Sequence, residues 1–183
     1  MKKLIFIIFT LLITNKALSS SKESIIDNLM SIENVSFDFE QNINGKIEKG
    51  KCVIKYPHKI NCKYSNLNKK VLISNGKSLV IKNSNGGYYL YPIDKTALNY
   101  ILDKNFIISE IKKADEKIME NKFINYTFSK NDNEINVFFD NKNFDLVGWK
   151  TLDIYKNLNI TFLSSILKNQ KIKKDLFKIP LKD

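Results

Sequence analysis

The sequence predicts a mainly β (α+β) fold, in which a single large curved antiparallel sheet, curled or half closed, has one face covered by helices. Most of the chain alternates apolar and polar residues with a period of two, in short runs separated by Asn/Gly turns. Helical spacing of apolar residues occurs only near the start and in the middle of the chain. Because an apolar sheet face must be buried, these two segments are the predicted cover.

The chain begins with a segment typical of a secretory signal peptide. Two lysines follow Met1, and the ten-residue run LIFIIFTLLI then contains Thr10 as its only polar residue. Ten helical residues rise about 15 Å, roughly half the hydrocarbon thickness of a bilayer, so a permanent membrane anchor is the weaker interpretation. We expect cleavage after Ser19, which makes residues 1–19 the signal peptide and the periplasm the expected location.

Residues 20–183 are expected to form a single domain. No Pro/Gly/Ser-rich linker or repeat divides them, and their number is enough for a sizeable core. The net charge of the full chain is +11, and the excess is all lysine because the chain contains no arginine. These lysines are scattered, whereas nucleic-acid binding usually needs a basic patch. Nucleic acid is therefore not an expected partner, and the lysines indicate a solvated surface or attraction to anionic lipid or an acidic protein.

A capping box opens the first predicted helix, which covers residues 20–32. Ser20 is followed three positions later by Glu23, and apolar residues then recur at helical spacing. From position 35 the period changes to two, which predicts a strand with Phe37 and Phe39 on one face.

The next segment, GKCVIKYPHKINCKY at residues 50–64, predicts a hairpin that turns at Pro57, where a missing N–H costs nothing. One face of this hairpin is apolar and the other is basic, with Val53 as the exception, and His58 is expected at the surface of the turn. The apolar face predicts either an ordinary core or the wall of a binding cavity, and periodicity does not distinguish the two. The residues on this face are Cys52, Ile54, Tyr56, Ile60, Cys62 and Tyr64.

The two cysteines of this hairpin have matching parity. If the turn centres on Pro57, Cys52 and Cys62 lie directly opposite each other, and an oxidising compartment permits a disulfide between them. The alternative is a pair of buried free thiols that act as small apolar residues. A zinc site is not expected, because a structural zinc ion usually needs four ligands and none lies at suitable spacing.

Asn75-Gly76 is the strongest signal for a two-residue hairpin turn, because both turn positions need positive φ. Pro92 ends the alternating pattern. Residues 96–111 then carry apolar residues at helical spacing with an interruption near 103–105, which predicts one or two short helices, with an exposed strand as the alternative. The other strands predicted are 71–74, 77–81, 88–91 after a turn at 83–87, 117–119, 123–128, 134–139, 144–149, 152–155 and 160–163, before residues 171–180 close the chain.

The sequence offers no catalytic arrangement, so an enzyme is not expected. The sequence pattern lacks the usual signs of an enzyme, which are a nucleophile with a base, paired carboxylates in a pocket, a set of metal ligands or a phosphate-binding loop. His58 alone cannot hold a metal cluster, and Asp38 and Glu40 lie on the strand face opposite the phenylalanines. No cofactor is expected.

Taken in order, these features resemble the outer-membrane lipoprotein carrier proteins of the LolA type. The resemblance covers nearly all of residues 20–183, and it depends on the order of short motifs. After the signal peptide and first helix, these motifs are FDFEQ at 37–41, Gly50, IKYP at 54–57, INCKY at 60–64, VLISNGK at 71–77, the apolar helix at 98–102 and FKIP at 177–180.

The resemblance implies a half-open β-barrel whose concave apolar face is covered by helices. It also implies a carrier, acting as a monomer, that accepts the acyl chains of lipoproteins from an inner-membrane ABC transporter and passes them to an outer-membrane receptor. A buried CH₂ contributes about 0.8 kcal/mol, so a 16-carbon chain needs such protection to cross water. A related periplasmic lipid-binding or envelope-sensing module, and a structural β-protein with a filled core, are the alternatives.

The same resemblance implies the residues of the binding site. The family favours an arginine before the hairpin proline, where it bonds to the helical lid, and often a tryptophan where Cys62 stands. This chain has Tyr56 before the proline, and we expect its hydroxyl to donate one hydrogen bond to a lid carbonyl. The expected acyl-binding residues are Phe37, Phe39, Cys52, Ile54, Tyr56, Ile60, Cys62 and Tyr64, with Leu98, Ile101 and Leu102 in the lid.

Overall fold

The computed structural model describes residues 20–65, 67–131, 133–153 and 155–182. The expected signal peptide, residues 1–19, lies outside the described residues. The helices are α1 (Ser21–Ser31), the 3₁₀ helix η1 (Ile93–Lys95), α2 (Leu98–Ile101) and α3 (Lys104–Lys113). The strands are β1 (Asn34–Ile43), β2 (Lys46–Lys55), β3 (Lys59–Tyr64), β4 (Val71–Asn75), β5 (Ser78–Lys82), β6 (Tyr88–Pro92), β7 (Lys117–Met119), β8 (Phe123–Lys130), β9 (Asn133–Asp140), β10 (Leu146–Leu152) and β11 (Leu158–Lys168).

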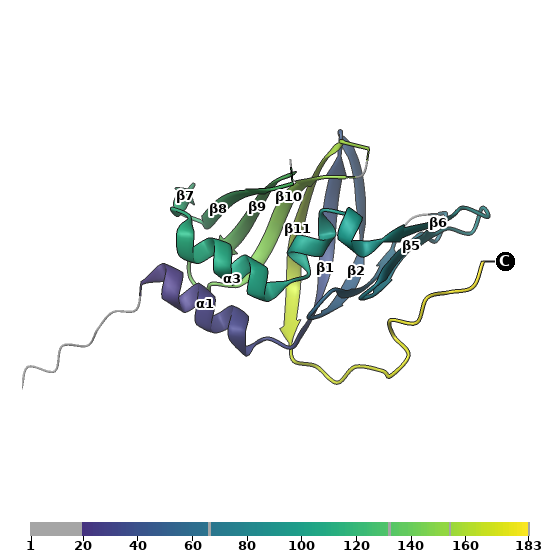
Figure 1. Cartoon of the computed structure of the whole chain (residues 1–183), viewed down its shortest axis with the longest axis horizontal. Helices are drawn as coiled ribbons and strands as arrows, with labels where there is room; N and C mark the ends of the chain where they lie inside the picture. The colour runs from purple at the N-terminus through teal and green to yellow at the C-terminus, as the bar shows by residue number, and fades with distance from the viewer. Residues whose placement is uncertain (1–19, 66, 132, 154, 183) are drawn as a thin grey trace, which may run out of the picture.

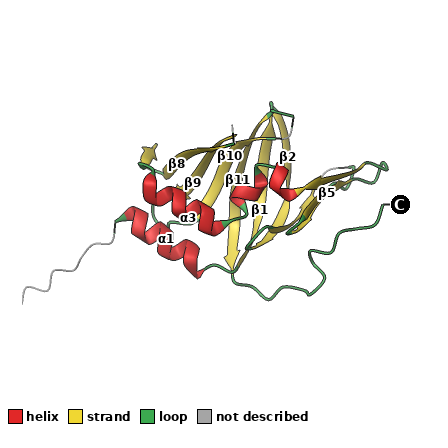
Figure 2. Cartoon of the chain, in the orientation of Figure 1, coloured by secondary structure: helices red, strands yellow, loops and turns green. Residues whose placement is uncertain are grey.

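All of these strands join one antiparallel sheet, in the order β6-β5-β4-β3-β2-β1-β11-β10-β9-β8-β7. The sheet curls into an open half-barrel, and the helices lie against its concave face (Figures 1 and 2). The first and last strands, β1 and β11, pair with each other at the middle of the sheet. The predicted fold class, a single large curved antiparallel sheet covered by an N-terminal helix and short mid-chain helices, is confirmed.

The first helix begins as its sequence predicts. The Ser20 hydroxyl accepts from the Glu23 amide at 3.2 Å, and the Ser20 amide donates to the Glu23 carboxylate at 3.1 Å, which completes the capping box. Ile25 and Leu29 are fully buried against the sheet. Lys22 and Lys104 tie α1 to α3, because their ammonium groups donate to Ala114, Met30 and Ile32 carbonyls.

The mid-chain segment is helical, and the exposed-strand alternative is wrong. A break separates α2 from α3 at the predicted interruption, where Asp103 caps α3 by accepting from the amides of Asn105 and Phe106. Ile107 and Ile111 of α3 are fully buried on the concave side. The helices therefore provide most of the cover that the sheet needs.

The hairpin of β2 and β3 turns at Pro57 as predicted, with Ile54 opposite Ile60 and Cys52 opposite Cys62. The two cysteines form a disulfide, with their Cα atoms 4.1 Å apart. The alternative of two buried free thiols is therefore wrong. The disulfide lies on the concave face of the sheet and is buried.

The turn predicted at Asn75-Gly76 is wrong by one residue. In the β4–β5 hairpin Ser74 pairs with Leu79, so the loop falls on Gly76 and Lys77 instead of Asn75-Gly76. Gly76 has φ +98°, but Asn75 ends β4 with its side-chain oxygen accepting the amides of Lys77 and Ser78. This side-chain bonding holds the asparagine in the strand and moves the turn by one residue.

The predicted strand at residues 152–155 is also wrong, although Ile154 lies outside the described residues. Leu152 ends β10, and the Asp153 carboxylate accepts the amides of Tyr155 and Asn157 in a turn. β11 starts only at Leu158. Local bonding by an aspartate therefore replaces the extended backbone that the apolar residues predicted.

Residues 171–180 close the chain without forming a strand. After β11 the segment runs below the sheet in the view of Figure 1, and the Pro180 carbonyl accepts a hydrogen bond from the Tyr88 hydroxyl of β6 at 3.2 Å. Phe177 is buried, and the Leu176 carbonyl accepts from the Asn61 side chain at 2.5 Å. This cover explains why Asn61, which the alternation places on the wet face, is 8% exposed.

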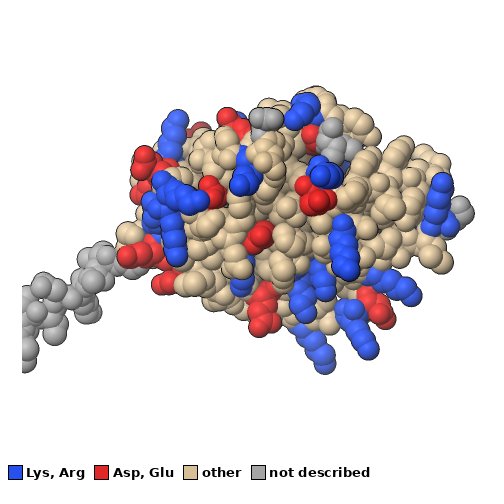
Figure 3. Space-filling model, viewed as in Figure 1, with Lys and Arg blue, Asp and Glu red and all other residues tan. Residues whose placement is uncertain are grey.

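Lysine side chains are spread over several elements of the surface, interspersed with acidic residues, and they gather along the lower edge of the view in Figure 3. Some lie in exposed ion pairs, such as Lys49 with Glu40 at 2.7 Å and Lys51 with Asp38 at 3.2 Å. Pairs of this kind contribute little to stability because water screens them. The lysine surface is compatible with solvation.

We predict that the disulfide stabilises the fold. Replacing Cys52 and Cys62 by alanine should lower the free energy of unfolding by about 2 kcal/mol, because a short closed loop loses its constraint in the unfolded chain. Urea unfolding of the variant and of the oxidised protein measures the difference. Dithiothreitol should reproduce the loss in the natural sequence and leave the variant unchanged. Equal urea midpoints in all samples would contradict the prediction.

Candidate functional site

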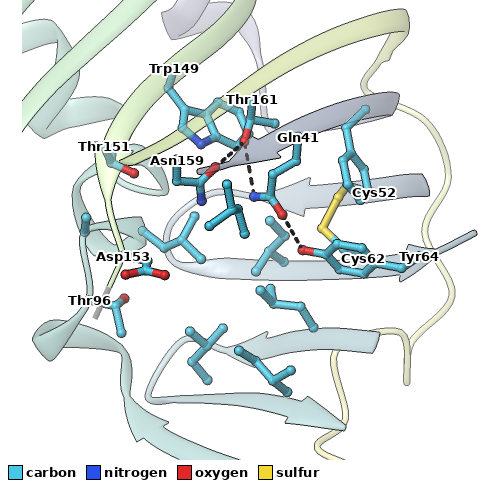
Figure 4. A pocket seen from close by; sticks show the side chains of 18 of the residues that line it. Gln41, Cys52, Cys62, Tyr64, Thr96, Trp149, Thr151, Asp153, Asn159 and Thr161 are labelled. Atoms are coloured by element: carbon cyan, nitrogen blue, oxygen red, sulfur yellow. Dashed lines mark hydrogen bonds between the residues drawn. A yellow bond between two sulfur atoms is a disulfide. The ribbon is translucent and has the colours of Figure 1, made fainter. Parts of the chain in front are cut away.

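A cavity of about 160 Å³ lies on the concave face of the sheet, beside the fully packed region under α1 and α3. Its walls come from strands on both sides of the β1–β11 seam, and residues 96–98, which lead into α2, contribute part of its cover. The walls are mostly apolar, with a band of polar side chains along one side (Figure 4). The apolar wall residues include Ile43, Ile60, Leu72, Leu79, Ile81, Ala97 and Leu98.

The structure divides the predicted site residues into two groups. The residues on the cavity wall are Phe39, Cys52, Ile60, Cys62, Tyr64 and, from the lid, Leu98. The residues in the packed core beside the cavity are Phe37, Ile54, Tyr56, Ile101 and Leu102. The second group lies away from the wall because the helices fill their half of the concave face. An acyl-binding role stays a prediction for both groups.

Close packing shapes the wall near the seam. The Phe39 ring lies over Gly50, where an added Cβ would stand 2.8 Å from the ring and 2.2 Å from the Lys63 carbonyl oxygen. Phe39 also meets the Tyr64 ring edge to face, with centroids 4.9 Å apart. Only glycine at position 50 leaves room for this arrangement.

Sequence reasoning missed the part of the wall that comes from β10, β11 and the β10–β11 turn. Trp149, Thr151, Asn159 and Thr161 all line the cavity. For Trp149 and Thr151 of β10, the face was not predictable by counting from the start of the strand, because the β9–β10 ladder shifts register between Leu146 and Gly148. Gln41 was predictable, since it has the same parity in β1 as Phe37 and Phe39.

The polar side of the cavity is a row of hydrogen-bonded side chains that crosses the seam (Figure 4). The Tyr64 hydroxyl donates to the Gln41 carbonyl oxygen at 3.1 Å, and the Gln41 amide donates to the Thr161 hydroxyl at 3.3 Å. The Thr161 hydroxyl then donates to the Asn159 carbonyl oxygen at 3.2 Å. We call Tyr64, Gln41, Thr161 and Asn159 the polar row.

An ion pair stands at the Tyr64 end of the polar row. The Lys70 ammonium contacts the Glu48 carboxylate and lies 3.8 Å from the centroid of the Tyr64 ring. Burial opposes ionisation of Glu48, but Lys70 and then Lys46 outweigh it and hold the pKa of Glu48 below its ordinary value. Burial, followed by the Glu48 charge, raises the pKa of Tyr64, which stays a neutral hydrogen-bond donor.

The lid is attached to the tip of the β2–β3 hairpin through the backbone. The His58 amide donates to the Leu102 carbonyl at 2.8 Å, and the His58 imidazole lies 4.0 Å from the Asp103 carboxylate. The expected hydrogen bond from the Tyr56 hydroxyl to the lid is wrong, because this hydroxyl has no hydrogen bond among the described residues. A single backbone bond beside the proline therefore occupies the place of the expected side-chain contact.

Two tyrosines meet across the cavity at its edge. Tyr91 of β6 and Tyr155 of the β10–β11 turn both line the cavity, and their hydroxyl oxygens are 3.3 Å apart. Their hydrogen bond, together with burial, raises the pKa of Tyr91 to about 12. Because β6 is six positions from β11 in the sheet order, this contact closes the half-barrel above the cavity.

We predict that the tyrosine contact slows exchange of apolar molecules. Tyr91→Phe and Tyr155→Phe each remove the hydroxyl bond, which is worth only about 0.5 kcal/mol at this exposed edge. Stopped-flow fluorescence with N-phenyl-1-naphthylamine should show entry and release two- to threefold faster in both variants. Tyr89→Phe on the same strand is the matched control and should change neither rate. Exchange at the natural rate in both Tyr91→Phe and Tyr155→Phe would contradict this role.

We also predict a pH-dependent contribution from Glu48. Its pKa is lower in the folded protein than in the unfolded chain, so the pair stabilises the fold fully above the ordinary value of 4.5, and this contribution is lost as the pH falls through the lowered pKa. At pH 7, Glu48→Gln should lower the free energy of unfolding by about 1–2 kcal/mol. The loss should disappear at low pH, and the exposed control Glu40→Gln should show little loss at any pH. A loss independent of pH would argue against it.

Within the described part of the chain, no helix has both the length and the apolar character needed to cross a bilayer. The same residues contain no group of three or more His, Cys, Asp or Glu side chains placed to hold a metal ion. The polar groups around the cavity are neutral amides and hydroxyls, the Lys70–Glu48 ion pair and the carboxylate of Asp153. Such a set suits binding of an amphiphilic molecule.

Solved structures with a similar arrangement include a LolA superfamily protein from Nitrosomonas europaea, at 8% identity and a TM-score of 0.43, which covers 88% of this chain and 99% of that one. A putative outer membrane lipoprotein-sorting protein domain from Vibrio parahaemolyticus has 6% identity and a TM-score of 0.46, covering 87% and 97%. MucB, known from Pseudomonas aeruginosa in complex with MucA, has 10% identity and a TM-score of 0.43, covering 90% of this chain and 64% of MucB.

No curated protein sequence matches the chain. A family model does match it, over residues 30–180, and this range holds every strand of the sheet, the lid and the whole wall of the cavity. The family is described as outer membrane lipoprotein carrier protein LolA. With its half-open sheet, helical lid and apolar cavity, the chain belongs to the LolA family.

Proposed function

We propose that this protein is a periplasmic carrier that holds the acyl chains of lipoproteins in the cavity under α2. The observation that carries the proposal is the cavity itself, an apolar space of about 160 Å³ left on the concave face of a LolA-family sheet. A filled core of the kind that a structural β-protein needs would leave no such space. The apolar wall supplies the environment that an acyl chain lacks in water.

The arrangement of the helices supports a site that opens. α1 and α3 are long, deeply buried on one face and tied together at both ends by lysine–carbonyl bonds. α2 spans only four residues, and the His58–Leu102 backbone bond joins it to the hairpin tip. Elements with few bonds open at lower cost than the rest of a fold. α2 and the residues before it are the part that would move to widen the cavity for a complete acyl chain.

The proposed cycle needs no catalysis by the protein. The partners are acylated lipoproteins, an inner-membrane ABC transporter that loads the carrier, and an outer-membrane receptor that empties it. Export by the N-terminal signal would place the protein, as a monomer, between the two membranes. The protein contributes only a protected site whose opening and closing set the rates of loading and release.

The proposal predicts a bound lipoprotein. Native mass spectrometry of the protein purified from the periplasm should find one diacylated or triacylated lipoprotein per chain, or show its uptake when lipoprotein is supplied. A free phospholipid in its place would indicate the lipid-binding alternative. A protein that stays empty under both conditions would overturn the proposal.

A lid variant sharpens this experiment. Leu98→Gln places an amide on the cavity wall and should weaken lipoprotein binding about 5- to 30-fold, because about 1–2 kcal/mol of apolar contact is lost. Leu90→Gln, an exposed residue of β6 that does not line the cavity, is the control and should bind as the natural protein does. Thermal unfolding of both variants checks that the fold is intact.

A further inference from the structure

In the polar row, each hydrogen bond is donated from one member to the next, in the order Tyr64, Gln41, Thr161 and Asn159. This order determines which groups remain available to a ligand. Each side-chain oxygen of Gln41 and Asn159 accepts a hydrogen bond from the previous member of the row. The Gln41 amide uses one N–H for Thr161, and its second N–H and both N–H groups of Asn159 have no partner among the described residues. Three N–H donors are therefore left over, beside the second lone pairs of the two amide oxygens.

A further hydroxyl stands beside these donors. Thr151 of β10 pairs directly with Asn159 of β11, lines the cavity and is 5% exposed. Its hydroxyl has no hydrogen bond among the described residues. The hydroxyl is not one of the buried side-chain atoms that lack a partner, so it keeps open surface and can bond to a molecule in the cavity. Thr151 and the amides of Gln41 and Asn159 thus form one donor cluster on the cavity wall.

The charges around the donor cluster argue against an anion. Asp153 lines the same side of the cavity, with its carboxylate accepting the amides of Tyr155 and Asn157. Lys70, which also lines the cavity, has its charge compensated by Glu48. The charge of Asp153 would repel a carboxylate or phosphate ligand, whereas a neutral oxygen acceptor carries no charge that it could repel.

The apolar wall and the donor cluster face the same space (Figure 4). A molecule that fits both has a hydrocarbon chain and, at one end, an uncharged oxygen that accepts hydrogen bonds. We propose that the donor cluster of Gln41, Asn159 and Thr151 binds the carbonyl oxygen of a neutral acyl ester, as found in the diacylglyceryl group of a lipoprotein. The inference rests on the proposed function and adds that the carrier binds the ester linkage selectively.

The experiment compares probes that differ at this linkage. The probes are 1-decanoylglycerol, the ether 1-O-decylglycerol, which lacks the carbonyl, and decanoate, which carries a charge. Displacement of N-phenyl-1-naphthylamine from the purified protein, below the micelle concentration of each probe, gives the affinities. The ester should bind five- to tenfold tighter than the ether, and decanoate should bind more weakly than the ester.

Variants distinguish the contribution of the donor cluster to binding from the contribution of the rest of the cavity. Thr151→Val, nearly isosteric, and Asn159→Leu should each bring the ester-to-ether ratio close to one by weakening the ester alone. Leu72→Ala on the apolar wall is the control, and it should weaken both glycerol probes equally. Circular dichroism confirms folding, and Thr151→Val keeps the test valid if Asn159→Leu does not fold.

The outcomes distinguish this inference from the proposed function. Equal binding of ester and ether by the natural protein, or tighter binding of decanoate, would overturn the ester site and leave a carrier that holds only chains. An ester preference unchanged in both variants would also overturn it. Failure of every probe, together with failure to take up lipoprotein, would overturn the carrier function itself.

Discussion

The concave face of a single curled sheet must be hidden from water, and here the helices hide only part of it. α1 and α3 lie over the part of the concave face that β8, β9 and β10 form (Figure 1), and their residues Ile25, Ile107 and Ile111 are fully buried. Beyond them, the cover is reduced to α2 and the residues before it. The cavity exists because the sheet is wider than the helices that the chain supplies.

The elements that follow local rules could be predicted from the sequence. The capping box at Ser20, the turn at Pro57 and the pairing of Cys52 with Cys62 each depend on residues close in the chain. Alternation predicted which residues of β1 to β3 point to the concave face, including Phe39 and Ile60. The family resemblance supplied the half-open form that periodicity alone leaves undecided.

The rest of the site depends on register and distant packing, which alternation does not specify. The bulge between Leu146 and Gly148 changes which residues of β10 face inward, so Thr151 could not be placed by counting. Side-chain bonding by Asn75 and Asp153 moved two turns. Ile60 lines the cavity and Ile54 does not, because α1 and α3 cover only part of the sheet. The sequence of either strand does not indicate where that cover ends.

The seam between β1 and β11 joins the two ends of the folded chain. Gln41 and Thr161, whose side chains meet there, are 120 residues apart in sequence. The ribosome makes β1 long before β11, so during synthesis one edge of β1 lacks its partner strand. The two halves of the cavity join only when nearly the whole chain has been made. A partly synthesised chain therefore cannot take up a ligand in this cavity, and the slowest folding step is expected to be this last, long-range pairing.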